Sequence, residues 1–117
     1  MEDSVITVDV DLLKQAVFNI VVNAIEAMKD GGTLRLEASL KGDDAEIRIA
    51  DSGPGIPPDV KEKIYDLYFT TKEHGSGIGL AMTFRIVQLH DGTIDFASEP
   101  GRGTTFVLRF PVSVALA

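Results

Sequence analysis

The chain has 117 residues, a length typical of one domain, and its 44% hydrophobic and 25% charged residues are enough for an ordinary globular core. The net charge of −7 argues against nucleic acid or an anionic membrane as a partner, although a local nest of backbone amides could still bind phosphate. Cysteine is absent, which excludes disulfides and thiolate metal sites, and no apolar run approaches the roughly 20 residues of a membrane span.

The first half of the chain reads as a strand, a helix and a hairpin. A short strand over residues 5–8 precedes an amphipathic helix, which Asp9 or Asp11 can cap and which Gly31 and Gly32 end. From Thr33 the hydrophobic period changes to two. This alternation runs through residue 51 and is interrupted by a turn at residues 42–44, which predicts an antiparallel hairpin with one solvated face.

The second half contains two helices, a loop and two strands. These are a short helix, a polar loop, a long helix and two strands, over residues 59–67, 68–76, 78–90, 93–98 and 104–112. One-sided strands need a cover, and the helices can supply it. We therefore predict an α/β fold: a two-layer α/β sandwich whose mixed, mostly antiparallel sheet is covered on one face by helices.

Asp51 ends a predicted strand and is followed by two glycines. It has the same parity as Ile47 and Ile49, so it is expected to face the helix layer. Burying an unpaired polar group costs roughly 2–7 kcal/mol, and a carboxylate costs more, so Asp51 needs a partner. The exocyclic amine of adenine would serve, whereas guanine presents an acceptor there. The alternative is a turn aspartate that caps Gly53; the sequence GPGIPP that follows favours the adenine site.

Asn19 and Asn23 lie four residues apart, one above the other on a helix with apolar flanks. Buried amides need hydrogen-bond partners. Magnesium with triphosphate oxygens is one possible partner, because Mg²⁺ takes oxygen ligands and keeps waters. The alternative for either residue is a structural amide that bonds to a loop.

Three glycines, Gly75, Gly77 and Gly79, lead into the second long helix, and amides at a helix N-terminus suit phosphate. Their spacing is neither the dinucleotide fingerprint nor a P-loop, so a flexible turn is the alternative. Lys72 could reach a terminal phosphate or be solvated. Thr104 shares parity with the apolar positions of its strand, so its hydroxyl is expected near the adenine or, alternatively, to be an ordinary strand threonine.

Five segments together resemble the N, G1, F, G2 and G3 boxes of sensor histidine kinases. In chain order they are NIVVNAIEAM, DSGPGIPP, LYFTTK, GSGIGLAM and GRGTTF. The set is far more specific than any one motif, and it covers nearly the whole chain. The resemblance is to the catalytic, ATP-binding domain, which belongs to the same superfamily as gyrase, the mismatch-repair ATPases and a heat-shock chaperone. It implies the Bergerat fold, with ATP and Mg²⁺ as cofactors.

The resemblance also implies site residues. Asn23 would bind Mg²⁺ with Asn19 assisting, and both would act in catalysis together with Lys72. Residues expected to contact the nucleotide are Asn23, Asp51, Gly53, Gly55, Ile56, Lys72, Gly75, Gly77, Ile78, Gly79, Leu80 and Thr104. Two departures stand out: Glu26 replaces a basic residue found in many such kinases, and the loop before the glycines lacks an arginine.

The implied function is transfer of the ATP γ-phosphoryl group to a histidine in two-component signal transduction. The acceptor would lie in a dimerisation domain of the same protein, with a response regulator receiver domain as the next partner; neither His74 nor His90 has a matching context. Residues 1–117 would then be a single ATP-binding domain of a longer protein. We expect a cytoplasmic location, because no signal peptide is visible, and a membrane anchor elsewhere in the parent protein would be compatible with it. Neither nucleic acid nor direct membrane contact is expected.

Three other functions use related folds or sites. An ATP-hydrolysing switch would need a glutamate base one turn before Asn23, where this chain has Asn19. A degenerate nucleotide-binding module is disfavoured by the intact Asp51, Asn23 and glycines. A serine kinase of anti-sigma type is the nearest alternative, and the identity of the acceptor would separate it from a histidine kinase. The polar loop over residues 68–76 is expected to act as a mobile lid.

Overall fold

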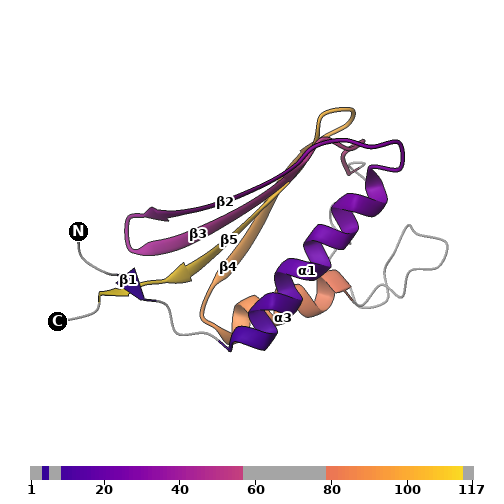
Figure 1. The fold of residues 1–117 in the computed structure, drawn as a ribbon. Coiled ribbons are helices and arrows are strands. Elements are labelled where there is room, and N and C mark those ends of the chain that lie inside the picture. Colours follow the sequence, from indigo (N-terminus) through magenta and orange to yellow (C-terminus); the bar gives the residue numbers. More distant parts are fainter. Residues whose placement is uncertain (1–3, 6–8, 57–78, 115–117) are drawn as a thin grey trace.

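The computed structural model describes residues 4–5, 9–56 and 79–114 and has two layers. Helices α1 (Val10–Ala27) and α3 (Gly79–Leu89) lie together on one face of a four-stranded sheet (Figure 1). The sheet order is β2-β3-β5-β4, with bounds Leu34–Lys41, Asp44–Asp51, Gly103–Pro111 and Thr93–Glu99. The predicted two-layer α/β sandwich is confirmed. The short helix and lid predicted over residues 59–67 and 68–76 lie outside the described residues.

All strand pairings in the described residues are antiparallel. They include a separate two-stranded sheet in which β1 (Ser4–Val5) pairs with β6 (Ser113–Val114). The mostly antiparallel sheet is therefore confirmed, while the parallel pair that makes a sheet mixed does not occur among the described strands. The predicted hairpin between β2 and β3 turns at Gly42, whose φ of 62° lies in the left-handed region that glycine tolerates.

Helix α1 begins at a single polar cap. Asp9 has extended backbone angles and accepts a hydrogen bond from the Leu12 N–H at 3.1 Å, so it is the N-cap, and Asp11 lies in the first turn. At the other end, the Met28 N–H bonds back to the Ala24 carbonyl at 3.1 Å. The helix therefore ends at Ala27, a few residues before the predicted Gly31 stop.

The hydrophobic core lies between the two helices and the central strands β3 and β5. Its buried members, each no more than 5% exposed, are Ile20, Ile49, Val87, Phe106, Leu108 and Phe110. They come from α1, α3 and the helix-facing positions of the two inner strands. This core fixes the ends of β3, β5 and α3 relative to α1, which is where the predicted site residues lie.

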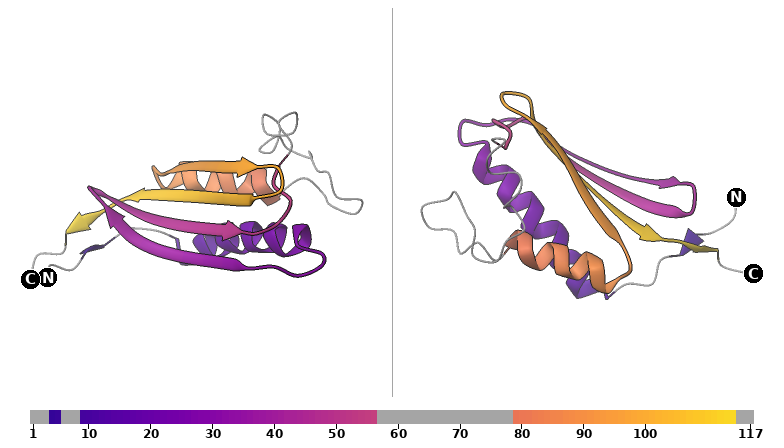
Figure 2. Two further views of the ribbon diagram at one scale, coloured as in Figure 1. Left: turned by 90° about the horizontal axis from the view of Figure 1, so that it is seen from above. Right: turned by 180° about the vertical axis from the view of Figure 1, so that it is seen from behind.

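Strand β2 departs from the predicted burial. Its apolar residues share a face as predicted, but the side chains of Leu36 and Leu40 are 51% and 57% exposed. The reason is position: β2 is an edge strand, and the β2–β3 hairpin extends beyond the helix layer (Figures 1 and 2). Correct alternation therefore does not give burial where no helix covers the strand.

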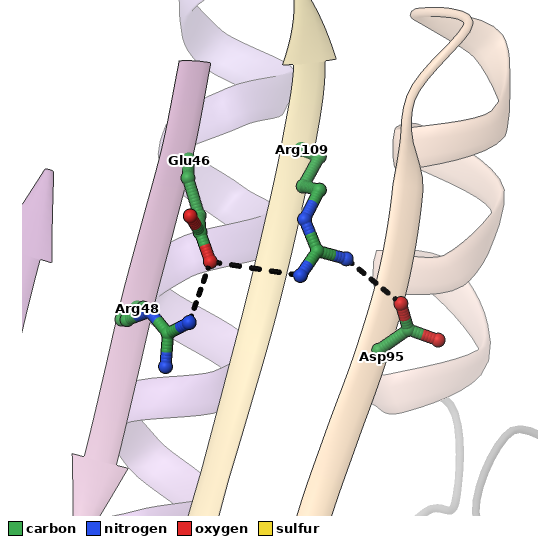
Figure 3. Close-up of polar contacts among 4 residues, drawn as sticks. All are labelled: Glu46, Arg48, Asp95 and Arg109. Carbon is green, nitrogen blue, oxygen red and sulfur yellow. Dashed lines mark hydrogen bonds and ion pairs between the residues drawn. The ribbon is translucent and has the colours of Figure 1, made fainter. Parts of the chain in front are cut away.

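The face of the sheet away from the helices carries an ion network (Figure 3). Glu46, only 2% exposed, lies 2.9 Å from Arg48 Nη2 and 3.6 Å from Arg109 Nη2 through its Oε1, and Arg109 Nη1 reaches Asp95 Oδ2 at 2.9 Å. The contacts to Oε1 lack hydrogen-bond alignment, so Coulomb attraction holds this carboxylate. The network joins β3, β5 and β4 side by side.

Neither helix within the described residues is long and apolar enough to cross a bilayer.

Candidate functional site

Three polar side chains form a row across the end of the sheet. Asp51, the last residue of β3, pairs with Thr104 near the start of β5, and Thr104 pairs with Ser98 in β4. Thr104 and Ser98 are buried, with 6% and 7% exposure, and Asp51 is partly buried. All three share the parity of helix-facing core residues, so the predicted orientations of Asp51 and Thr104 agree with the structure.

The two carboxylate oxygens of Asp51 have different surroundings. Oδ1 accepts hydrogen bonds from the Gly53 N–H at 2.9 Å and the Thr104 N–H at 3.2 Å. The turn-capping role that we weighed against adenine binding is therefore present. No described residue donates a hydrogen bond to Oδ2, which remains an acceptor held in a fixed orientation by the bonds to Oδ1. One carboxylate can thus cap the turn and still accept from a ligand.

Ser98 is a site residue that the sequence reasoning missed. Its Oγ accepts the Ile56 N–H at 2.6 Å, lies 2.9 Å from Thr104 Oγ1 and donates to the Gly103 carbonyl at 3.2 Å. It thereby joins the end of β4, the start of β5 and the loop after Asp51. The signal that could have found it is parity, because Ser98 shares a face with Ile94 and lies opposite Thr104 across a short turn.

The loop after Asp51 passes close to its neighbours. Gly55 has φ of 81°, and an added Cβ would overlap the Glu99 carbonyl. Gly53 lies against the end of α1, since its added Cβ would be 3.3 Å from Met28 Cγ. Packing within the protein is therefore sufficient reason for glycine at position 55, which the resemblance implied as a nucleotide contact.

On the helix side, Asn19 joins α1 to the start of α3. Its Nδ2 donates to the Gly79 carbonyl at 3.1 Å and lies 3.4 Å from Thr83 Oγ1. This contact matches the structural alternative for the amide nitrogen, and no described residue bonds to Oδ1. Asn23 follows one turn later and is also partly buried. The two amides thus lie on the side of α1 that faces α3.

The N-terminus of α3 leaves room near Gly79. Its added Cβ would be 3.7 Å from Asn19 Cγ, an ordinary contact, so the described residues do not themselves require glycine there. Leu80 and Ile56 are partly buried and pack against the core, and the Ile56 N–H is already bonded to Ser98 Oγ. The predicted contacts Lys72, Gly75, Gly77 and Ile78 lie outside the described residues, as does His74.

His90 lies at the other end of α3 and belongs to the frame of the domain. Its Nε2 accepts the Asp9 N–H at 2.9 Å, and its Nδ1 lies 2.7 Å from the Ile86 carbonyl. The ring therefore joins the start of α1 to the end of α3.

The described residues fit an adenine nucleotide with magnesium. Asp51 Oδ2, which has no donor among the described residues, is an acceptor suited to an amine. Asn19 carries an amide oxygen beside the start of α3, and Asn23 carries another one turn further along α1. No group of three or more histidine, cysteine, aspartate or glutamate residues that could hold a metal occurs among the described residues. A magnesium ion here would depend on amide and phosphate oxygens and on water, which suits its coordination chemistry.

Comparison with known proteins identifies the family. Residues 8–114 match the family described as histidine kinase-, DNA gyrase B-, and HSP90-like ATPase. The sensor histidine kinase ZraS of Escherichia coli K12 is 43% identical over 93% of this chain, and the histidine-protein kinase AtoS of the same organism is 42% identical over 96%. These alignments cover only 23% and 19% of the two relatives, so the chain spans about a fifth of their length.

Solved structures agree. The catalytic domain of histidine kinase ThkA has a TM-score of 0.80 and 33% identity, covering 91% of this chain and 70% of that one. Full-length ShkA in complex with AMPPNP has a TM-score of 0.79 and 31% identity, covering 91% and 22%. The chain belongs to the histidine kinase-, DNA gyrase B- and HSP90-like ATPase family, and it has the fold of a histidine kinase catalytic domain.

Proposed function

We propose that this domain binds Mg·ATP and transfers the γ-phosphoryl group to a histidine on a separate dimerisation domain of the same protein. The observation that carries the proposal is the Asp51 carboxylate, whose Oδ1 accepts from the Gly53 and Thr104 amides and whose Oδ2 has no donor among the described residues. A fixed acceptor at the end of a buried strand selects a ligand that presents a donor there. The 6-amino group of adenine is such a donor.

The phosphate end of the nucleotide would lie between α1 and the N-terminus of α3. Asn23 would supply an amide oxygen to Mg²⁺, with Asn19 assisting, and the bound ion would neutralise charge on the phosphate oxygens. Backbone amides at Gly77, Gly79 and Leu80, with Gly75 and Ile78 beside them, would bind phosphate, and Lys72 would approach its terminal group. On the base side, Gly53, Gly55, Ile56 and Thr104 would shape the adenine site.

Rapid ATP hydrolysis is disfavoured by the chemistry of position 19. An amide cannot take a proton from water, and the Asn19 nitrogen is already bonded to the Gly79 carbonyl. Positioning an acceptor in line with the phosphoryl group then falls to another domain, and the two relatives are about four and about five times as long as this chain. A kinase of the anti-sigma type, with a serine acceptor, is the second candidate. The described residues bind the nucleotide and do not distinguish a serine hydroxyl from a histidine imidazole as the phosphoryl acceptor.

Transfer can be tested with γ-labelled ATP. The isolated chain is expected to bind Mg·ATP but neither to label itself nor to release phosphate quickly, because phosphoryl transfer depends on a positioned acceptor. Adding the histidine-bearing domain of the parent protein should produce label that is lost in acid and stable in base. Acid-stable label on a serine would instead support the second candidate, and brisk phosphate release by the isolated chain would contradict both.

Asn23→Ala is expected to weaken Mg·ATP binding by about tenfold or more while changing metal-free ADP binding by less than about threefold. The reason is that the amide oxygen would serve the metal rather than the base. Calorimetry with both ligands measures the effect. Asp11→Ala, an exposed position three turns earlier on α1, is the control. A folded Asn23 variant with unchanged metal dependence would make the residue structural only.

A further inference from the structure

We infer that Thr83 is a positioning residue that sets the orientation of the Asn19 side-chain amide for the metal and phosphate end of the site. The inference depends on the proposed function, because it concerns how this protein's own residues would prepare that site. Thr83 is not among the predicted site residues; it lies inside α3 with 0% exposure.

The hydroxyl of Thr83 joins the two helices α1 and α3. Its Oγ1 lies 3.0 Å from the Gly79 carbonyl, 3.3 Å from the Ala16 carbonyl of α1 and 3.4 Å from Asn19 Nδ2. A hydroxyl has one hydrogen and two acceptor lone pairs. The two carbonyls only accept, so the hydroxyl hydrogen points toward them and the hydroxyl accepts from Asn19.

This arrangement defines which end of the Asn19 amide faces α3. Gly79 O and Thr83 Oγ1 both present acceptors to Asn19, at 3.1 and 3.4 Å, so the atom between them must be the donor nitrogen. The flipped amide would place Oδ1 against the Gly79 carbonyl oxygen and lose that bond, and Thr83 would have to turn its hydrogen away from the two backbone carbonyls to donate to Oδ1. Oδ1 is thereby turned away from the Gly79–Thr83 pair. It has no hydrogen-bond partner among the described residues and could coordinate a metal ion.

The consequence is a link between the two helices that carry the site. The Thr83 hydroxyl bonds to the carbonyl of Gly79, the first residue of α3, and to the Ala16 carbonyl of α1. One buried hydroxyl therefore holds both the start of α3 and the amide of Asn19. Without the hydroxyl, the amide would retain only the Gly79 contact and could rotate. Loss of the hydroxyl should therefore weaken the binding of ligands that contact Asn19 Oδ1. It should leave unchanged the binding of ligands that depend only on the adenine site.

The test compares Thr83→Val, which keeps the branched shape, with Thr83→Ser, which keeps the hydroxyl. Thr83→Val is expected to weaken Mg·ATP binding about fivefold, the effect of one buried hydrogen bond, and metal-free ADP binding less than twofold. Thr83→Ser should restore Mg·ATP binding to within about twofold of wild type. Thr105→Val, a threonine on the opposite face of the sheet, is the control and should change neither ligand.

A second readout needs no ligand. The side-chain amide resonances of Asn19 should be dispersed and slowly exchanging in the wild type and in Thr83→Ser, and should shift toward solvent values in Thr83→Val. Should the valine variant fail to fold, Thr83→Ala takes its place, because it also removes the hydroxyl and leaves no bulk to misfit; it should reduce Mg·ATP binding more than ADP binding.

Two results would overturn the inference: unchanged Asn19 resonances in Thr83→Val, or equal loss of Mg·ATP and ADP binding in either variant. A wild-type protein that binds no Mg·ATP would instead refute the proposed function, and the amide resonances would then decide the positioning role by themselves.

Discussion

Asp51→Asn should weaken ATP and ADP binding by about 100-fold, equivalent to about 2.7 kcal/mol. Asparagine can keep its amide oxygen in the place of Oδ1 and so retain the bonds from Gly53 and Thr104. It then presents an NH₂ donor where Oδ2 stood, against the amino group of adenine. Two donors facing each other lose the hydrogen bond and leave both groups unsatisfied, so the effect exceeds the loss of one ordinary bond.

The same substitution should remove discrimination against guanine, whose O6 accepts from an amide NH₂. Calorimetry with ADP and GDP on both proteins measures affinity and selectivity together, and thermal unfolding verifies that the turn is intact. Asp44→Asn, at the other end of β3, is the control and should change neither ligand. Equal affinity of the wild type for ADP and GDP would show that Asp51 acts only as a turn cap.

Hydrophobic period was sufficient to predict most of the described elements. The apolar spacing in α1 and α3 and the alternation in β3, β4 and β5 gave each element to within a few residues. The reason is that these elements contribute one face each to a single core, so burial selects the pattern that was read. Parity also oriented Asp51 and Thr104 correctly, because both lie on strands whose neighbouring residues are buried.

The hydrophobic pattern did not predict which strand residues the helices would cover, nor which distant residues a polar side chain would contact. Strand β2 alternates as regularly as β3, yet Leu36 and Leu40 are exposed because β2 is the edge strand and the hairpin extends beyond the helix layer. Ser98 and Thr83 are buried hydroxyls whose partners lie in other elements, and a single polar letter in a helix or strand does not name a distant partner. The ion network of Glu46 likewise depends on register across three strands.

Glycines were the least well explained class. The family resemblance implied Gly55 as a nucleotide contact, whereas its positive φ and its contact with the Glu99 carbonyl are sufficient to require glycine. Gly79 shows the reverse, since the described residues would accept a side chain there. Backbone approach across a turn is a tertiary property, so sequence can mark a glycine as special without saying whether protein or ligand requires it.

Gly103→Ala should be the most destabilising single-methyl change in the described part of the site, at about 3–4 kcal/mol. Its φ is 91°, which costs an alanine about 1 kcal/mol or more, and the added Cβ would overlap the Asp51 carbonyl and lie 3.1 Å from Ser52 Cα. Relief requires the β3 and β5 ends to separate, which moves the Asp51 carboxylate away from the Thr104 amide. Nucleotide binding should therefore fall together with stability.

Gly101, in the same turn, allows the effect of backbone strain to be measured without the effect of steric overlap. It has φ of 79° and no atom within 4 Å of an added Cβ, so Gly101→Ala should cost only the backbone term, about 1 kcal/mol, and leave nucleotide affinity within about twofold. Urea unfolding of the two variants, followed by ADP titration at a temperature where both are folded, gives both quantities. Similar stability loss in the two variants would mean that the turn yields freely, and the close packing of Gly103 on Asp51 would then not be what fixes the adenine acceptor.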